Sequence, residues 1–247
     1  MEWNSRLKPR VRLISHTNDP YKVLYLAITE CTTKSSSVEK IDNQSIPPLD
    51  VLKKKVKQFA NYSHGSVLEH VTFTFAIDNM SRTTSHQIVR HRIASYSQKS
   101  QRYVDTKNFI DEYIIPVKIS NNKDANYDFI KCLDKISEMI TFFKSKYPDI
   151  PNEEVRYSLP NATKTSLVLT MNTRELLHFF SVRCCSRSQF EIRYIANQML
   201  EQCKEVLPEI FENAGPPCVS LGICLETKKF SCGKAKTLEE IKQELNI

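Results

Sequence analysis

Glycine is the residue whose scarcity most restricts what this chain can fold into. The 247 residues contain only Gly65, Gly215, Gly222 and Gly233. A dinucleotide-binding fingerprint and a P-loop both need glycines clustered within a few residues, so that the backbone can approach a phosphate closely. Neither loop can be built here. Any bound phosphate must therefore be held mainly by side chains, above all by arginine.

The hydrophobic pattern predicts an α+β fold with a mainly antiparallel sheet flanked by helices. Apolar and polar side chains alternate over residues 71–77, as in a half-buried strand, and residues 166–171 read as another strand. Helices are predicted over residues 50–62, 81–94, 127–146, 151–159, 173–183 and 188–206, and after a capping box at 237–240. Residues 95–105 read as a polar loop. We expect a single domain over residues 1–247.

The composition indicates a globular protein with anionic partners. Hydrophobic residues make up 40%, charged residues 26%, and the formal net charge is +7. We find neither a signal peptide nor an apolar run long enough to span a membrane. We therefore expect a cytoplasmic protein that does not bind membranes.

The eight cysteines are expected to be thiols in that reducing compartment. Cys132 and Cys203 fall on apolar helical stripes, where cysteine behaves as a small hydrophobic residue. The spacing of Cys218, Cys224 and Cys232 matches no common zinc pair, so no metal is expected.

The strongest local signal is the segment RHRIASYSQKSQRY at residues 90–103. Three consecutive ionisable residues near a helix end would fan around that helix and could contact two ligands or two subunits. Arg102 offers a planar fork for phosphate, and Ser100 offers a hydroxyl group. Taken alone, the segment also fits a solvated basic helix end or a nucleic-acid patch.

The order of residues in this segment resembles the signature of the flavin-dependent thymidylate synthases, RHRxxS followed after a short gap by SxR. Further segments resemble this family in the same order, and the resemblance covers about residues 27–199. They are HGSVLEH at 64–70, RYSLP at 156–160, NTR at 172–174 and SQFEIR at 188–193. Position 98 carries Gln where the family commonly has Glu. Residues 214–247 form a C-terminal extension to which no role is assigned.

The resemblance implies an activity and a set of ligands. Members of the family methylate dUMP to dTMP, with 5,10-methylenetetrahydrofolate as carbon donor and NADPH-reduced FAD as hydride source. They are homotetramers whose sites are shared between subunits. The resemblance implies no cysteine nucleophile and no nucleic-acid partner.

Site residues are carried over motif by motif. The resemblance implies that dUMP contacts Gln87, Arg90, Gln98, Lys99, Ser100, Gln101, Arg102, Arg156 and Arg183. It implies that FAD contacts Ser66, Arg90, His91, Arg92, Gln98, Asn172, Arg174 and His178. His64 and Glu69 are further candidates. Arg183 resembles the catalytic residue, because a fixed guanidinium can stabilise the negative charge of the pyrimidine as its N3 loses a proton.

Two other interpretations stay open from the residues alone. A nucleic-acid-binding protein that uses Arg90, Arg92 and Arg102 would lose affinity steeply with salt and would bind no flavin. A different flavoprotein on the same scaffold would bind flavin but show no turnover that depends on dUMP.

Overall fold

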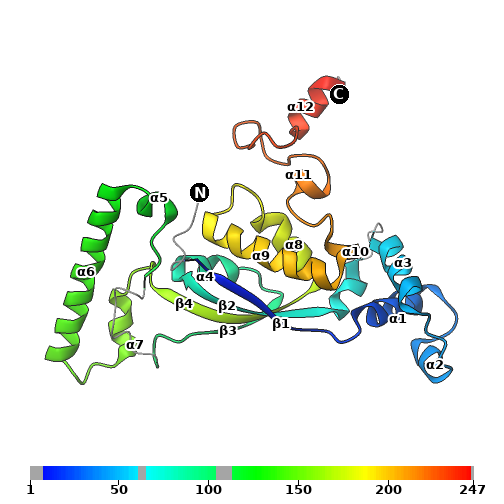
Figure 1. The fold of residues 1–247 in the computed structure, drawn as a ribbon, viewed down its shortest axis with the longest axis horizontal. Coiled ribbons are helices and arrows are strands. Elements are labelled where there is room, and N and C mark those ends of the chain that lie inside the picture. Colours follow the sequence, from blue (N-terminus) through cyan, green and yellow to red (C-terminus); the bar gives the residue numbers. More distant parts are fainter. Residues whose placement is uncertain (1–7, 61–64, 104–112, 246–247) are drawn as a thin grey trace. The chain divides into compact units, whose positions relative to one another are not determined.

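A computed structural model describes residues 8–60, 65–103 and 113–245 of the chain. Four strands form one antiparallel sheet in the order β1-β2-β4-β3, with helices flanking it (Figure 1). The strands are β1 (Arg10–His16), β2 (Thr72–Ser81), β3 (Ala94–Gln98) and β4 (Lys164–Asn172). The predicted α+β class is therefore confirmed.

The helices are spread along the whole described chain. The N-terminal half contains α1 (Pro20–Thr32), α2 (Ser37–Asp42), α3 (Leu49–Ala60), the 3-10 helix η1 (Gly65–His70), α4 (Arg82–Ile88) and α5 (Val117–Ser120). The C-terminal half contains α6 (Lys123–Lys146), α7 (Asn152–Val155), the 3-10 helix η3 (Arg156–Ser158), α8 (Thr173–Arg183), α9 (Phe190–Val206), α10 (Pro208–Phe211), α11 (Pro217–Ser220) and α12 (Leu238–Leu245). None of these described helices is both long and apolar enough to cross a membrane.

Contacts between residues divide the chain into two compact units. Unit 1 consists of Met1–Arg10, Ile77–Arg90 and Tyr96–Val168, and unit 2 consists of Val11–Ala76, His91–Ser95 and Leu169–Ile247. Each of the four strands contributes residues to both units. The expectation of a single domain stays a prediction.

Unit 2 has a core rich in aromatic side chains. Phe73 of β2 and Phe180 of α8 both pack edge-on against Phe211 of α10, with ring centroids 5.6 and 5.9 Å apart. Val71, Phe73 and Phe75, all on one side of the predicted alternation, are fully buried. Burial of large aromatic groups is a dominant contribution to core stability, and it fixes α8 in place.

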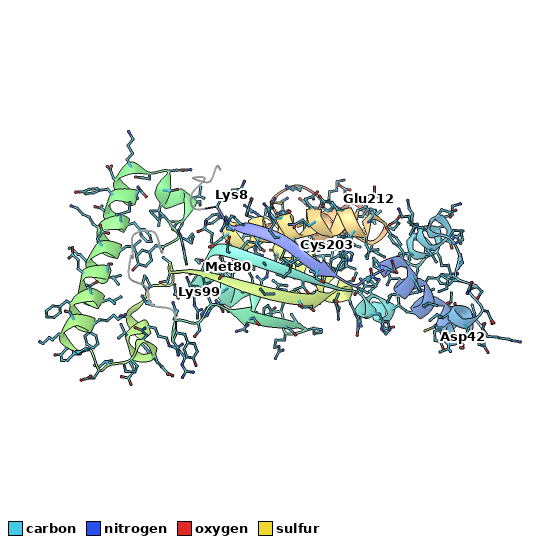
Figure 2. The ribbon with its side chains drawn as sticks, turned by 60° about the horizontal axis from the view of Figure 1, so that its bottom comes forward. Lys8, Asp42, Met80, Lys99, Cys203 and Glu212 are labelled. Carbon is cyan, nitrogen blue, oxygen red and sulfur yellow. The ribbon has the colours of Figure 1, made fainter. Side chains whose placement is uncertain are left out.

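Unit 1 has a smaller core beside the long helix α6. Tyr113, Leu133, Ile140 and Val155 form this cluster, in which α6 supplies Leu133 and Ile140. Near the C-terminal end of β2, Met80 is buried. Lys99, just after β3, is exposed (both are labelled in Figure 2). The predicted helix over residues 127–146 is confirmed and begins four residues earlier, because Asn122 caps it.

Three sequence expectations are corrected. The helix that Ser81 caps ends at Ile88 and does not continue to Ala94. Residues 94–98 of the expected polar loop form β3, which pairs with β4 at the edge of the sheet, where alternating polar side chains are tolerated. Cys203 is buried as predicted, but Cys132 lies on an exposed face of α6.

Candidate active site

Helix α8 carries several of the predicted site residues, and its first turn is firmly anchored in unit 2. Asn172 accepts a hydrogen bond from the backbone N–H of Glu175 at 2.9 Å, as an N-cap should. Thr173 donates its backbone N–H and its hydroxyl to the carbonyl of Val71, at 2.8 and 3.0 Å. The helix then presents Arg174, Glu175, His178 and Arg183 at fixed positions.

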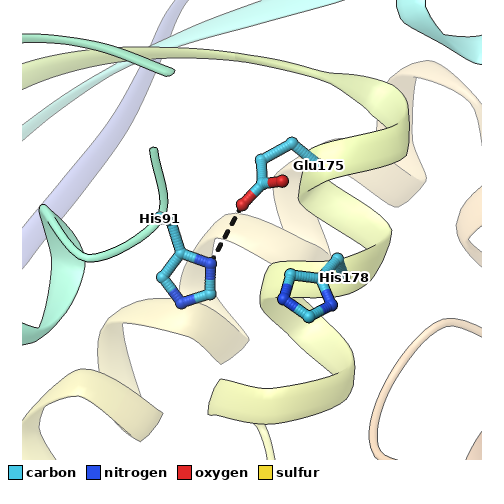
Figure 3. Close-up of side chains that lie close together, drawn as sticks. All are labelled: His91, Glu175 and His178. Atoms are coloured by element: carbon cyan, nitrogen blue, oxygen red, sulfur yellow. Dashed lines mark hydrogen bonds and ion pairs between the residues drawn. The ribbon is translucent and has the colours of Figure 1, made fainter. Parts of the chain in front are cut away.

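His91 joins two of these α8 side chains in a chain of hydrogen bonds. Its Nδ1 lies 3.0 Å from a carboxylate oxygen of Glu175 (Figure 3), and Arg183 donates from Nε to its Nε2 at 3.0 Å. The ring packs edge-on against Phe179 and lies 5.6 Å from the ring of His178. His91 and Glu175 are both buried.

Burial sets the electrostatics of this group. It lowers the pKa of His91, against the opposing effect of the hydrogen bond to Glu175, and the charge of Arg183 lowers it further. Burial also lowers the pKa of Arg183, although an arginine stays charged at neutral pH. At neutral pH the imidazole of His91 is therefore neutral, and the guanidinium of Arg183 keeps its charge.

His91, Glu175 and His178 also have the mutual spacing of a metal site, because their candidate ligand atoms all lie within 4.8 Å of one another. The surroundings of these three side chains disfavour the binding of a metal cation. Arg183 already donates to Nε2 of His91, and its positive charge lies beside the position that an ion would occupy. The donor set suits the hydrogen-bonded arrangement better than a metal ion.

A second group in unit 2 lies where η1 meets α8. Arg174 pairs with Glu69, and a Cβ atom at Gly65 would lie only 3.2 Å from Nε of Arg174. Gly65 thus allows the guanidinium to lie close against the backbone beside Ser66. An exposed guanidinium such as that of Arg174 suits an anionic ligand such as a diphosphate.

Unit 1 holds three arginines close to Glu153, and one of them pairs with its carboxylate. Arg102 donates from Nε and Nη2 to Glu153, at 2.9 and 2.8 Å, and Arg156 donates to the backbone carbonyl of Glu153 at 3.0 Å. The pKa of Arg82 is lowered by burial and by the charge of Arg156. Three guanidinium groups with one carboxylate leave an excess of positive charge, which suits a dianion.

The end of β3 and the loop after it supply further polar groups to unit 1. Gln98 donates its amide N–H to the hydroxyl of Thr165 at 3.2 Å, a bond that a carboxylate at this position could not donate. Ser100 accepts from the backbone N–H of Arg102 at 3.2 Å. The backbone N–H of Lys99 donates to Ser166 at 2.9 Å, which ties the loop to β4.

The remaining predicted residues have simpler positions. Gln87 is half-buried on α4, and Gln101 is half-buried in the turn after β3. Arg90 and Arg92 are exposed in the turn between α4 and β3, so the prediction that residues 90–92 fan around a helix is wrong. His178 is exposed on α8. His64 lies outside the described residues.

Two acidic residues of these clusters were missed by the sequence analysis. Glu175 occupies the first turn of α8, where an acidic residue is common for reasons of helix electrostatics alone. Its spacing from His178, three residues along one helix face, was the available signal. No local pattern distinguishes Glu153, because its partner Arg102 is 51 residues away in the sequence.

Comparison with known proteins gives the family. The model of the family described as "Thymidylate synthase complementing protein" matches residues 12–209. A flavin-dependent thymidylate synthase of Nitratidesulfovibrio vulgaris is 39% identical over 93% of this chain and 96% of its own length. One of Clostridium tetani is 40% identical over 94% of this chain and 96% of its own. This chain belongs to the flavin-dependent thymidylate synthase family.

The flavin-dependent thymidylate synthase fold is shared at lower identity. A crystal structure of the Helicobacter pylori enzyme, complexed with FAD and dUMP, covers 83% of this chain and 99% of its own with a TM-score of 0.64 at 23% identity. That likeness shows the common fold. The matched segment 12–209 contains all the residues of the clusters described above.

Proposed function

We propose that this chain is a flavin-dependent thymidylate synthase that methylates dUMP to dTMP, with FAD as cofactor and 5,10-methylenetetrahydrofolate and NADPH as co-substrates. One observation carries the proposal. Relatives of that activity are 37–40% identical over more than nine-tenths of this chain in Nitratidesulfovibrio, Clostridium and Pyrococcus abyssi. The arginine and histidine clusters lie within the segment that the family shares.

The unit 1 cluster supplies the proposed site for the phosphate of dUMP. Arg102 and Arg156 bring two guanidinium groups to Glu153, and the Ser100 hydroxyl lies two residues before Arg102. Charge-assisted hydrogen bonds of this kind are roughly twice as strong as neutral ones. We propose that Gln87, Arg90, Gln98, Lys99 and Gln101 complete the contacts with the nucleotide.

Arg183 is the residue that we propose to be catalytic. Its guanidinium is partly buried and fixed through Nε, so that its charge acts in a medium of low dielectric constant. Negative charge develops on the pyrimidine as N3 loses its proton, and a preorganised cation lowers the energy of that state. The charged ring is then a better nucleophile at carbon.

The unit 2 groups fit FAD. Arg174 and Ser66 beside Gly65 suit its diphosphate, and we propose that His178, Asn172, His91 and Arg92 add further contacts, as do Arg90 and Gln98. FAD, when bound and reduced, supplies the hydride that completes the methyl group. The protein contributes binding, orientation and charge. We also propose that His64 and Glu69 border this site.

We also propose that the protein is a homotetramer and that it is located in the cytoplasm. A homotetramer with sites shared between subunits would explain why cationic side chains such as Arg90 and Arg92 are exposed in one chain. The eight cysteines are all thiols, as a reducing cytoplasm would keep them.

A binding experiment tests the assignment of the two ligands. FAD added to the purified protein should give a bound flavin spectrum, and dUMP should perturb that spectrum with saturation. Arg102→Ala should weaken dUMP binding by about 10- to 100-fold and leave FAD binding nearly unchanged, since a hydrogen bond to a charged group contributes roughly 1.5–3 kcal/mol. Failure to bind FAD would overturn the proposal. Equal loss of both ligands would remove Arg102 from the dUMP site.

A further inference from the structure

We propose that Glu175 is a positioning residue that acts through His91 to fix the guanidinium of Arg183. This inference rests on the proposed role of Arg183 in the thymidylate synthase reaction. It adds a buried carboxylate to the residues that the sequence motifs indicate. The three side chains lie in unit 2, and their contacts with one another run from Glu175 to His91 and from His91 to Arg183.

The direction of each hydrogen bond follows from the chemistry of arginine. The Nε of a guanidinium always carries a hydrogen and can only donate, so Nε2 of His91 must be the acceptor in the 3.0 Å contact. A neutral imidazole that accepts at Nε2 carries its proton at Nδ1. That proton is then donated to the carboxylate oxygen of Glu175, 3.0 Å away. Glu175 therefore selects the tautomer that Arg183 needs.

The alternative tautomer would break the chain at both contacts. A proton on Nε2 would face the Nε–H of Arg183, and an unprotonated Nδ1 would face the carboxylate of Glu175. A doubly protonated ring would also place its positive charge beside the guanidinium. Burial of His91 disfavours the charged ring, and it makes any unsatisfied group costly.

His91 connects Glu175 and Arg183, which are too far apart along α8 to contact each other directly. Glu175 and Arg183 are eight residues apart, which corresponds to about 12 Å along the helix axis. The imidazole enters from a different segment of the chain, as Figure 3 shows, and contacts both side chains.

A double-mutant cycle on dUMP affinity tests this role in the FAD-loaded enzyme. Glu175→Leu removes the acceptor, and it should weaken dUMP binding by about 10-fold in the otherwise unchanged protein but less than about 2-fold in Arg183→Ala. Glu175→Gln keeps an acceptor oxygen for Nδ1–H and should stay within about 3-fold of the wild type. Glu205→Leu, on the exposed face of α9, is the matched control and should bind dUMP normally.

Equal losses from Glu175→Leu in both backgrounds would overturn the proposal, because a structural role does not depend on Arg183. If Glu175→Leu fails to fold, the ¹⁵N chemical shifts of the histidine rings in the wild-type holoenzyme decide the question. The signals absent from His91→Gln identify His91, and the proposal requires the Nδ1–H form. An Nε2–H or doubly protonated His91 would overturn it. This readout needs no turnover, so it is distinct from a failure of the proposed function, which would appear as wild-type enzyme making no dTMP.

Discussion

Arg183 combines a fixed position with a partly desolvated charge. Its Nε is engaged by His91, and burial lowers the pKa of the guanidinium without discharging it. A cation in this state costs little reorganisation when negative charge develops beside it, which is the condition for strong electrostatic stabilisation. The exposed Arg187, four residues later, forms a surface pair with Glu226 and lacks this environment.

Arg183→Ala should lower the rate of dTMP formation by about 100- to 1,000-fold, the loss typical of one preorganised donor. Bound FAD, measured from the absorbance of the purified variant, should be retained. Arg187→Ala is the control and should keep nearly the wild-type rate. Unchanged turnover in Arg183→Ala would remove this residue from the mechanism.

His91 should make stability depend on pH in a known direction. The unfolded chain protonates this ring near its ordinary pKa of about 6.5. The pKa is lowered in the folded protein, by burial and by the charge of Arg183, although the hydrogen bond to Glu175 opposes the shift; His178 is a further neighbour that lowers it. Between about pH 6.5 and the lowered pKa, the unfolded state therefore binds more protons than the folded state.

The free energy of unfolding should fall as the pH drops below about 6.5, by at most roughly 1.4 kcal/mol per pH unit from this group. Urea titrations between pH 5 and 8 would measure it, and His91→Gln should flatten the slope. His86→Gln, at an exposed position of α4, should leave the slope unchanged. A slope that persists in His91→Gln would assign the effect to other groups.

The start of α8 links the fold to the site. Asn172 caps the helix, and Thr173 ties its first turn to Val71. The same helix carries Arg174, His178 and Arg183, so fraying at its start would loosen several proposed contacts together. Asn122 caps α6 in unit 1 in the same way, but α6 carries no proposed site residue.

Asn172→Ala should lower the free energy of unfolding by about 1 kcal/mol, the usual effect of losing an N-cap, and should also reduce turnover. Asn122→Ala should cost a similar amount of stability and leave turnover unchanged. Asn172→Ser should restore most of the stability, because serine also caps. If Asn172→Ala and Asn122→Ala changed turnover equally, the cap of α8 would have no special role in function.

The sequence predicts the elements whose period is strong and local. Residues 71–77 alternate and form β2, and helix α8 has the predicted bounds because Asn172 signals its start. Strand β3 was missed because its polar residues gain their structure from pairing with β4, which lies far along the chain. Local pattern contains no information about that pairing.

The residues of the candidate site were also only partly predictable from the sequence. Motif resemblance indicated His91, Arg102, Arg156 and Arg183, and the structure brings His91 to Arg183 and Arg102 to Arg156 through Glu153. Contact between side chains 92 or 51 residues apart requires the folded chain. The partner Glu153 could not be read from the sequence for that reason, whereas the spacing of Glu175 from His178 on α8 was its only local signal.

For the whole molecule, the two units contain different parts of the proposed chemistry. The proposed dUMP residues fall in unit 1 except for Arg183, and the proposed FAD residues fall in unit 2 except for Arg90 and Gln98. A tetramer with shared sites could combine them from different subunits, as symmetric assemblies allow.

Mixed oligomers test the sharing of sites. Arg102→Ala and Arg183→Ala should each keep at most about a tenth of wild-type activity alone at low dUMP. If the two residues of one site come from different subunits, random mixing of equal amounts should restore roughly a quarter of wild-type activity. Dissociation and reassembly of the two variants, followed by a dTMP assay, would measure this. No recovery would place both residues of each site in one subunit.

dTMP formation by the purified wild-type protein with FAD, NADPH, 5,10-methylenetetrahydrofolate and dUMP tests the proposed activity. Product would be quantified by mass spectrometry while each component is omitted in turn. We expect dTMP in the complete mixture and none when dUMP, the folate or the reductant is left out. A protein that binds FAD and dUMP and oxidises NADPH, yet makes no dTMP in the complete mixture, would contradict the proposed activity.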